Sequence, residues 1–206
     1  PAAVPRARPH PPKPVAVNHD QQFEALGRST LSTWFRLNPV TATQVGSHIA
    51  DGEIDDLSAK GRAASLAFVR DTLAQLEAID RSALSRENQI DYAMLRNELL
   101  SQTWTLETLQ SFAWDPQVYS QRAGGAIYSL MAREFAPLPE RLKSATRRIE
   151  KLPQLFVQAR ENLDPARVPS IHAETVAKQH NGILGLVEQF ITPNLDPLDE
   201  EERERA

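Results

Sequence analysis

Three side chains that could bind a ligand surround a pair of glycines in the middle of the chain. Tyr119, Arg122 and Tyr128 flank Gly124 and Gly125. Arginine presents a fork of donors that fits a carboxylate, and tyrosine combines an apolar ring with a hydroxyl group. Glycine lets the backbone come close to another group. We predict that these three side chains face a substrate or ligand, with packing against a neighbouring part of the protein as the alternative.

The five histidines do not form a recognisable metal site. His172 and His180 are eight residues apart, which is about 12 Å along a helix and too far for a pair that binds one ion. The sequence contains no H-E-x-x-H motif, G-x-S-x-G motif, P-loop or cysteine. It therefore predicts no catalytic residue, no metal ligand and no cofactor within this chain.

The composition limits the classes of partner. The net charge of -4 leaves no basic surface of the kind that binds nucleic acid, so we expect no nucleic-acid partner. No apolar run reaches the length of about 20 residues that a helix needs to cross a bilayer, so we expect no transmembrane segment.

Hydrophobic residues recur at helical spacing along most of the chain, and no segment alternates as a strand would. One helix is predicted to end at Asn38, which caps a short second helix that begins at Pro39 and ends at Gly46. Three longer helices are predicted to begin behind serine caps, at Ser58, Ser85 and Ser170. Only residues 111–136 lack this regularity, and we predict that they form the least regular part of the fold.

The helices that follow Ser58 and Ser85 are predicted to pack as an antiparallel hairpin. The second of them has an apolar face that we expect to be buried, comprising Ile90, Met94, Leu95, Leu99, Leu106 and Leu109. The predicted fold class is all-α, built from antiparallel helical hairpins.

The chain divides into three parts. Residues 1–20 contain six prolines, which favours an extended tether; a proline-rich ligand segment is the alternative. Residues 21–197 form the helical domain. Residues 198–206 are acidic and have no apolar face, so they are predicted to begin a helix that is cut off, the alternative being a solvated tail. The first residue is Pro1 rather than methionine, which predicts a trimmed product that has lost an export signal.

Five motifs in a fixed order resemble the bacterial domain-of-unknown-function 885 family over about residues 22–190. They are residues 38–48 (NPVTATQVGSH), 76–80 (LEAID), 84–92 (LSRENQIDY), 133–142 (REFAPLPERL) and 152–163 (LPQLFVQARENL). Members of that family are longer and mostly helical. They are often exported or lipid-anchored, and they are similar in fold to zinc metallopeptidases of the gluzincin type.

The resemblance implies that this chain is the N-terminal portion of a larger helical, metallopeptidase-like fold. The family's metal motif, a His-Glu pair followed by Pro-Gly-His, has no match here. Zinc and catalytic groups are then expected in the rest of the protein, and this chain is expected to be inert alone, as a scaffold and channel wall. Its implied partners are the missing C-terminal part and a peptide substrate, and its implied location is the periplasm or cell envelope. A free-standing helical binding module of the cell envelope is the alternative.

Overall fold

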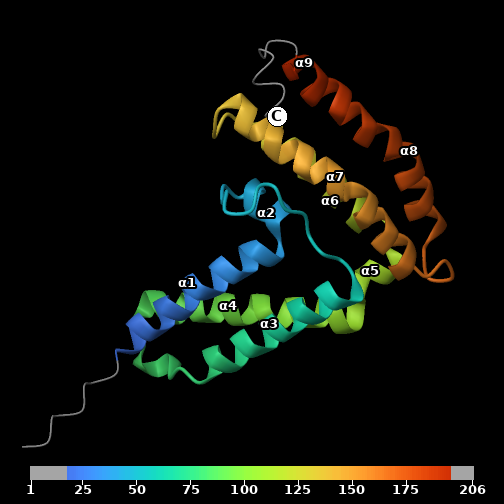
Figure 1. Cartoon of the computed structure of the whole chain (residues 1–206). Helices are drawn as coiled ribbons and strands as arrows, with labels where there is room; N and C mark the ends of the chain where they lie inside the picture. Colours follow the sequence, from blue (N-terminus) through green and yellow to red (C-terminus); the bar gives the residue numbers. More distant parts are fainter. Residues whose placement is uncertain (1–17, 196–206) are drawn as a thin grey trace, which may run out of the picture.

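The computed structural model describes residues 18–195, and in that range every regular element is helical (Figure 1). This confirms the predicted all-α class. The α-helices are α1 (His19–Leu37), α2 (Pro39–Gln44), α3 (Ala59–Glu77), α4 (Arg86–Trp104), α5 (Ser111–Trp114), α6 (Gln117–Met131), α7 (Leu138–Asn162), α8 (Ser170–Leu186) and α9 (Thr192–Leu195). A 3₁₀ helix, η1 (Arg81–Ala83), and two π-helical segments, η2 (Thr105–Leu109) and η3 (Val187–Ile191), complete the set. Most of the predicted tether and all of the acidic segment lie outside the described residues.

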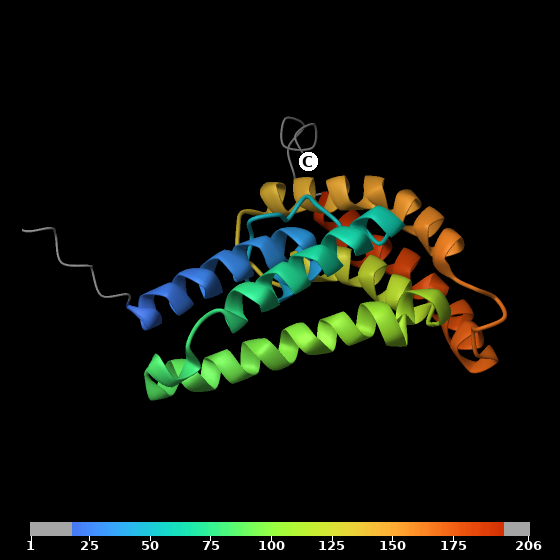
Figure 2. The ribbon, with the colours of Figure 1, turned by 90° about the horizontal axis from the view of Figure 1, so that it is seen from below.

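The helices form two groups, each around its own apolar cluster (Figures 1 and 2). In the first group, α1, α3 and α4 pack around a cluster of buried side chains that includes Phe23, Val69, Leu76 and Leu99. In the second, α6, α7 and α8 pack around a cluster that includes Ile127, Leu130, Leu142 and Leu155. The predicted hairpin of α3 and α4 lies within the first group.

The short helix α2 joins the two groups because it packs against both α1 and α6. Its Val40 is fully buried. A Cβ atom added to Gly125 would lie 2.8 Å from Nε2 of Gln44 and 3.3 Å from Cγ1 of Val40. The glycine thus permits a close approach of α6 to α2, which outweighs the intrinsic cost of glycine in a helix.

The prediction that residues 111–136 form the least regular part of the fold was wrong. Most of that range forms α5 and α6, and the turn between them contains Asp115 and Pro116. The glycine pair lies inside α6, so its close approach is between two helices.

Two of the three predicted serine caps are confirmed. The hydroxyl of Ser58 accepts a hydrogen bond from the Gly61 amide at 3.1 Å, and that of Ser85 accepts from the Asn88 amide at 3.4 Å. Ser170 is instead the first residue of α8. The N-cap position is occupied by Pro169, and no side chain caps the helix there.

The turn between α1 and α2 lies where it was predicted, but the side chain of Asn38 has a different role. Its side-chain amide donates to the carbonyl of Trp34 at 3.0 Å, so it closes the end of α1 instead of capping α2. Pro39 is the first residue of α2, as predicted. Gly46 has a φ of 92°, a left-handed conformation that glycine adopts without strain.

The predicted buried face of α4 was wrong at its N-terminal end. Leu99 is buried, but Ile90 and Met94 are 46% and 67% exposed. In the described part of the chain α4 packs mainly against α3 and, less closely, against α1. Neighbours on one side cover only one stripe of the helix, and Ile90 and Met94 lie beyond it.

Candidate functional site

The connection between α2 and α3 contains a stretch without regular structure, residues 52–57, which we call the extended segment and which lies along α7. Lys151 Nζ donates to the carbonyl of Gly52 at 2.8 Å, and the side chain of Gln158 accepts from the amide of Leu57 at 2.9 Å. Asn162 Nδ2 donates to the carbonyl of Leu57 at 2.7 Å. Lys151, Gln158 and Asn162 are separated by seven and four residues, so they share one face of α7. That face holds the segment in place.

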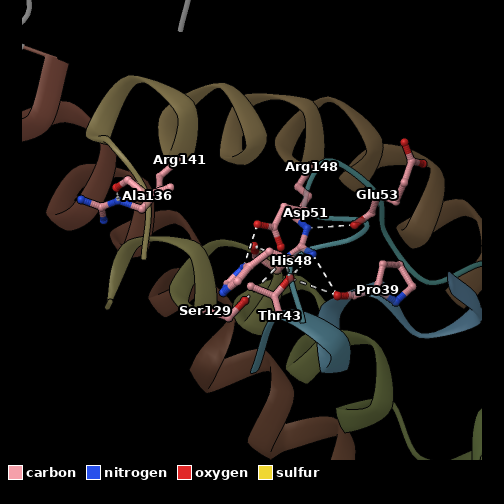
Figure 3. Close-up of polar contacts among 10 residues, drawn as sticks. Pro39, Thr43, His48, Asp51, Glu53, Ser129, Ala136, Arg141 and Arg148 are labelled. Carbon is pink, nitrogen blue, oxygen red and sulfur yellow. Dashed lines mark hydrogen bonds and ion pairs between the residues drawn. The ribbon is translucent and has the colours of Figure 1, made fainter. Parts of the chain in front are cut away.

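Arg148 begins the same face of α7 and is fully buried. Its guanidinium group donates hydrogen bonds to groups on three other parts of the chain (Figure 3). The acceptors are the carbonyl oxygens of Glu53 (2.8 Å), Ala126 (3.0 Å) and Pro39 (3.0 Å) and the hydroxyl groups of Thr43 (2.7 Å) and Ser129 (3.4 Å). One side chain therefore ties α2, α6 and the extended segment to α7.

The charge of Arg148 is balanced by nearby carboxylates. Burial lowers the pKa of Arg148 to about 10, while Asp51, Asp55 and Glu53 act in the opposite direction. At neutral pH the guanidinium group is still protonated, so all of its donors are available.

A series of polar side-chain contacts continues from Arg148 through Thr43 and Asp51 to His48. The hydroxyl of Thr43 donates to Oδ1 of Asp51 at 2.7 Å, and Oδ2 of Asp51 lies 2.9 Å from Nδ1 of His48 (Figure 3). The ring of His48 stacks on Phe135 with 3.7 Å between the ring centroids. Pro39, Thr43 and His48 belong to the first of the five motifs, so the side chains of that motif help to hold the structure together.

A cavity of about 330 Å³ lies between the first group of helices and α5 and α6. Charged groups at its wall include Asp55, Arg62, Glu98 and Arg122. Clefts of this size and mixed lining are typical of small-molecule sites. The cavity is therefore the candidate ligand site of the described region.

The ion pair at this cavity is incompletely hydrogen-bonded. Nε of Arg122 lies 3.2 Å from Oδ2 of Asp55, and the Asp55 side chain is 2% exposed. The pair lacks the alignment of a good hydrogen bond, and the backbone N–H groups of Asp55 and Val40 also stabilise the carboxylate.

Burial raises the pKa of Asp55, and the positive charges of Arg122 and Arg148 oppose that shift. A raised pKa in the folded state means that the stability contributed by protonated Asp55 is lost as pH increases. The loss begins above about pH 4, where aspartate ionises in the unfolded chain.

We expect Asp55→Asn to be less destabilising, or more stabilising, at pH 7 than at pH 4. Asparagine cannot ionise, so the stability that is lost when residue 55 ionises is lost by the wild type and not by the variant. Urea unfolding at both pH values measures the difference between variant and wild type. Asp71→Asn, at an exposed position of α3, is the control that should show no such trend. An equal difference at both pH values for Asp55→Asn would contradict the raised pKa.

The three predicted ligand-facing residues all lie on α6 but in different surroundings. Tyr119 is 2% exposed, and its hydroxyl donates to the carbonyl of Phe112 at 2.7 Å. Tyr128 is 52% exposed, and its ring lies edge-on to Phe190. Of the three, Arg122 alone lines the cavity. A ligand-facing role for Tyr119, Arg122 and Tyr128 stays a prediction.

Among the side chains that the structure describes, no group of three histidine, aspartate or glutamate residues could hold a metal ion. His172 is bonded elsewhere, because its Nδ1 lies 2.9 Å from Oδ1 of Asp115 and 3.2 Å from the side-chain nitrogen of Gln117. The described residues therefore do not fit a metal centre.

The sequence interpretation missed Arg148 and Asp55. Arg148 falls within an apolar stripe of α7 that contains Ala145, Leu152 and Leu155, at intervals of three and four residues. An arginine at such a core position was the available signal. Asp55 gave none, because it lies in an acidic loop and is buried only through contacts with distant helices.

Comparisons with known proteins agree with this fold. The profile of a family described as "Bacterial protein of unknown function (DUF885)" matches residues 39–206. No curated protein shows significant similarity to the sequence. A solved structure from Shewanella oneidensis, provisionally described as a lipoprotein of unknown function, superimposes with a TM-score of 0.80 at 26% sequence identity. The match covers 89% of this chain and 33% of that one, so this chain spans about a third of the length of the solved structure.

None of the described helices is long and apolar enough to cross a membrane.

Proposed function

The chain belongs to the bacterial family of unknown function DUF885, and from this we propose that it serves as a helical scaffold and substrate-channel wall in a longer, exported protein. The observation that carries the proposal is the cavity between the two groups of helices, where Arg122 and Asp55 meet. The lipoprotein description of the solved relative supports a location in the cell envelope.

We further propose that the longer protein is a metallopeptidase-like hydrolase of the gluzincin type. Zinc would polarise the scissile carbonyl and activate water there. Its ligands would be supplied by the C-terminal part of that protein, because the described side chains offer no suitable group. The role of the described helices would be to bind and orient a peptide, and no bond-breaking step is assigned to them.

Peptide hydrolysis by the complete protein tests this proposal. We expect turnover of a fluorogenic peptide mixture that stops when a chelator is added, and no turnover by the 206-residue chain alone. A peptide carrying a photo-reactive group should cross-link to the cavity-lining parts of α3, α4 and α6. Absence of hydrolysis by the complete protein, or cross-links confined to other surfaces, would contradict the proposal.

A free-standing binding module of the cell envelope is the second candidate. The binding-module candidate is favoured by the two buried apolar clusters and the Arg148 network, which give the described region a core of its own. It predicts that the chain is monodisperse and unfolds cooperatively by itself. Strong binding of a hydrophobic dye by the isolated chain would instead favour the scaffold that needs a partner.

A further inference from the structure

We propose that the N-terminal segment of the chain, residues 1–17, binds along one exposed side of α4. This side, which we call the exposed α4 face, consists of uncharged residues that are all exposed and includes Ile90, Met94, Asn97, Leu100, Ser101 and Trp104. The prolines and aliphatic residues of the segment pack on the face, and its basic side chains pair with carboxylates along one edge. The inference goes beyond the proposed function and does not depend on it.

The exposed α4 face lies opposite the side of the helix that packs within the first group. Tyr92 and Leu99 are buried on the packed side, and at 100° per residue the exposed α4 face is centred about 150° away from them. Figure 2 shows α4 (green) along one edge of the molecule, with α1 and α3 on one side of it. A helix that is apolar on both sides is normally buried, and an exposed apolar patch marks a binding surface. The exposed α4 face therefore requires an occupant.

Three carboxylates follow one edge of the exposed α4 face. Glu87, Asp91 and Glu98 are exposed, and their spacing of four and seven residues places them in a line along the helix. None of them forms an ion pair with a residue in the described part of the chain. Arg96, on the other edge, is already paired with Glu77 at 2.9 Å. The acidic edge is therefore free to bind a cationic partner.

The N-terminal segment has the complementary charge. It contains Arg6, Arg8 and Lys13, six prolines and no acidic residue. The edge carries three negative charges against the single positive charge of Arg86 at its start. Proline-rich segments bind apolar and aromatic surfaces as preformed extended helices, which lose little entropy on binding. Charge and composition together make this segment the occupant.

The segment joins the fold beside the start of α4. Oδ1 of Asp20 accepts hydrogen bonds from the amide of Ser85 at 3.0 Å and from the side chain of Asn88 at 2.7 Å. In the extended form that prolines favour, about 15 Å of chain separates residue 18 from residue 13, which exceeds the helix diameter of about 10 Å. The segment is therefore long enough to pass around the end of α4 and reach its exposed face.

The spacing of the charges also fits. Arg8 and Lys13 are about 16 Å apart in an extended polyproline helix. Glu87 and Glu98 are about 17 Å apart along α4. A segment that runs back along α4 from its attachment point thus brings its basic residues to the two ends of the acidic edge.

Labelling of a single introduced thiol tests the inference. The chain contains no cysteine, so Met94→Cys places one thiol on the exposed α4 face. A segment joined directly to the fold acts at an effective concentration of about 1 mM, so a dissociation constant of about 0.1 mM would cover the face for roughly nine-tenths of the time. We expect maleimide to label the thiol about tenfold faster when residues 1–17 are deleted. Combined replacement of Arg6, Arg8 and Lys13 by glutamate in the 206-residue chain should have the same effect, because it reverses the charges that the edge attracts.

Ile171→Cys is the matched control, because Ile171 is nearly as exposed as Met94 but lies on α8, in the second group of helices. Its labelling rate should not change in either altered chain. The thermal unfolding midpoint of each variant verifies that it is folded. The inference is overturned if deletion of residues 1–17 leaves the labelling rate at position 94 unchanged, or if the charge-reversed chain is labelled as slowly as the original. Equally slow labelling with and without the segment that becomes faster on dilution would identify a second copy as the occupant instead.

Discussion

Replacement of Arg148 by methionine is expected to lower the free energy of unfolding by about 3–5 kcal/mol, the range measured when one partner of a buried charged network is removed. Methionine fills a similar space with no donor. Three carbonyl groups and two hydroxyl groups would lose a partner inside the fold. Asp55 would also lose a nearby positive charge that stabilises its ionised form.

Urea denaturation with a circular dichroism signal measures this effect. Arg147→Met is the matched control, since Arg147 is the exposed neighbour of Arg148 on the same helix. We expect that control to change the free energy of unfolding by less than about 0.5 kcal/mol. If both variants behave alike, the guanidinium network does not hold the four segments together.

Replacement of Gly61 by alanine is expected to destabilise the protein by about 2 kcal/mol. A Cβ atom at this position would lie 2.1 Å from the backbone oxygen of Asp56 and 2.7 Å from its carboxyl carbon. The backbone there cannot move freely, because the amide of the next residue, Leu57, donates to Oε1 of Gln158 at 2.9 Å, and this bond ties the chain to α7. The strain of overpacking, about 1–3 kcal/mol or more, exceeds the gain of up to about 1 kcal/mol from replacing glycine in a helix.

Gly27→Ala in α1 provides the comparison of opposite sign. A Cβ atom at Gly27 has no neighbour within 4 Å. The same substitution should therefore stabilise the protein by about 0.5–1 kcal/mol through helix propensity alone. Thermal and urea unfolding of the two variants side by side measure both effects. Stabilisation by Gly61→Ala would show that α3 and the extended segment are not packed as described.

The elements that could be predicted from the sequence are those fixed by local chemistry. Ser58 and Ser85 cap their helices through the adjacent amides, and Pro39 begins α2 because its φ suits the first turn. Gly46 adopts the left-handed conformation that a helix exit favours. All of these depend on residues within one helical turn.

The features that could not be predicted depend on contacts between distant segments. Gly124 and Gly125 are poor helix formers, and the reason for glycine at position 125 is the close approach of α2, a distant segment of the chain. Ile90 and Met94 fit a buried stripe by spacing, but the number of neighbours around α4 decides their exposure. For the candidate site, Arg122 was predicted from its chemistry, whereas its pairing with Asp55 depends on the path of the extended segment.

The extended segment also determines when the junction between the two groups of helices can form. Its bonds to α7 join residues 95 to 105 positions apart, from Arg148 with Glu53 to Asn162 with Leu57. At a synthesis rate of about 5–20 residues per second, α7 follows the segment from the ribosome by roughly 5–20 s. The local contacts of α1, α3 and α4 can form during that interval, but the junction cannot. The junction is therefore a late product of folding, completed only when Arg148 arrives.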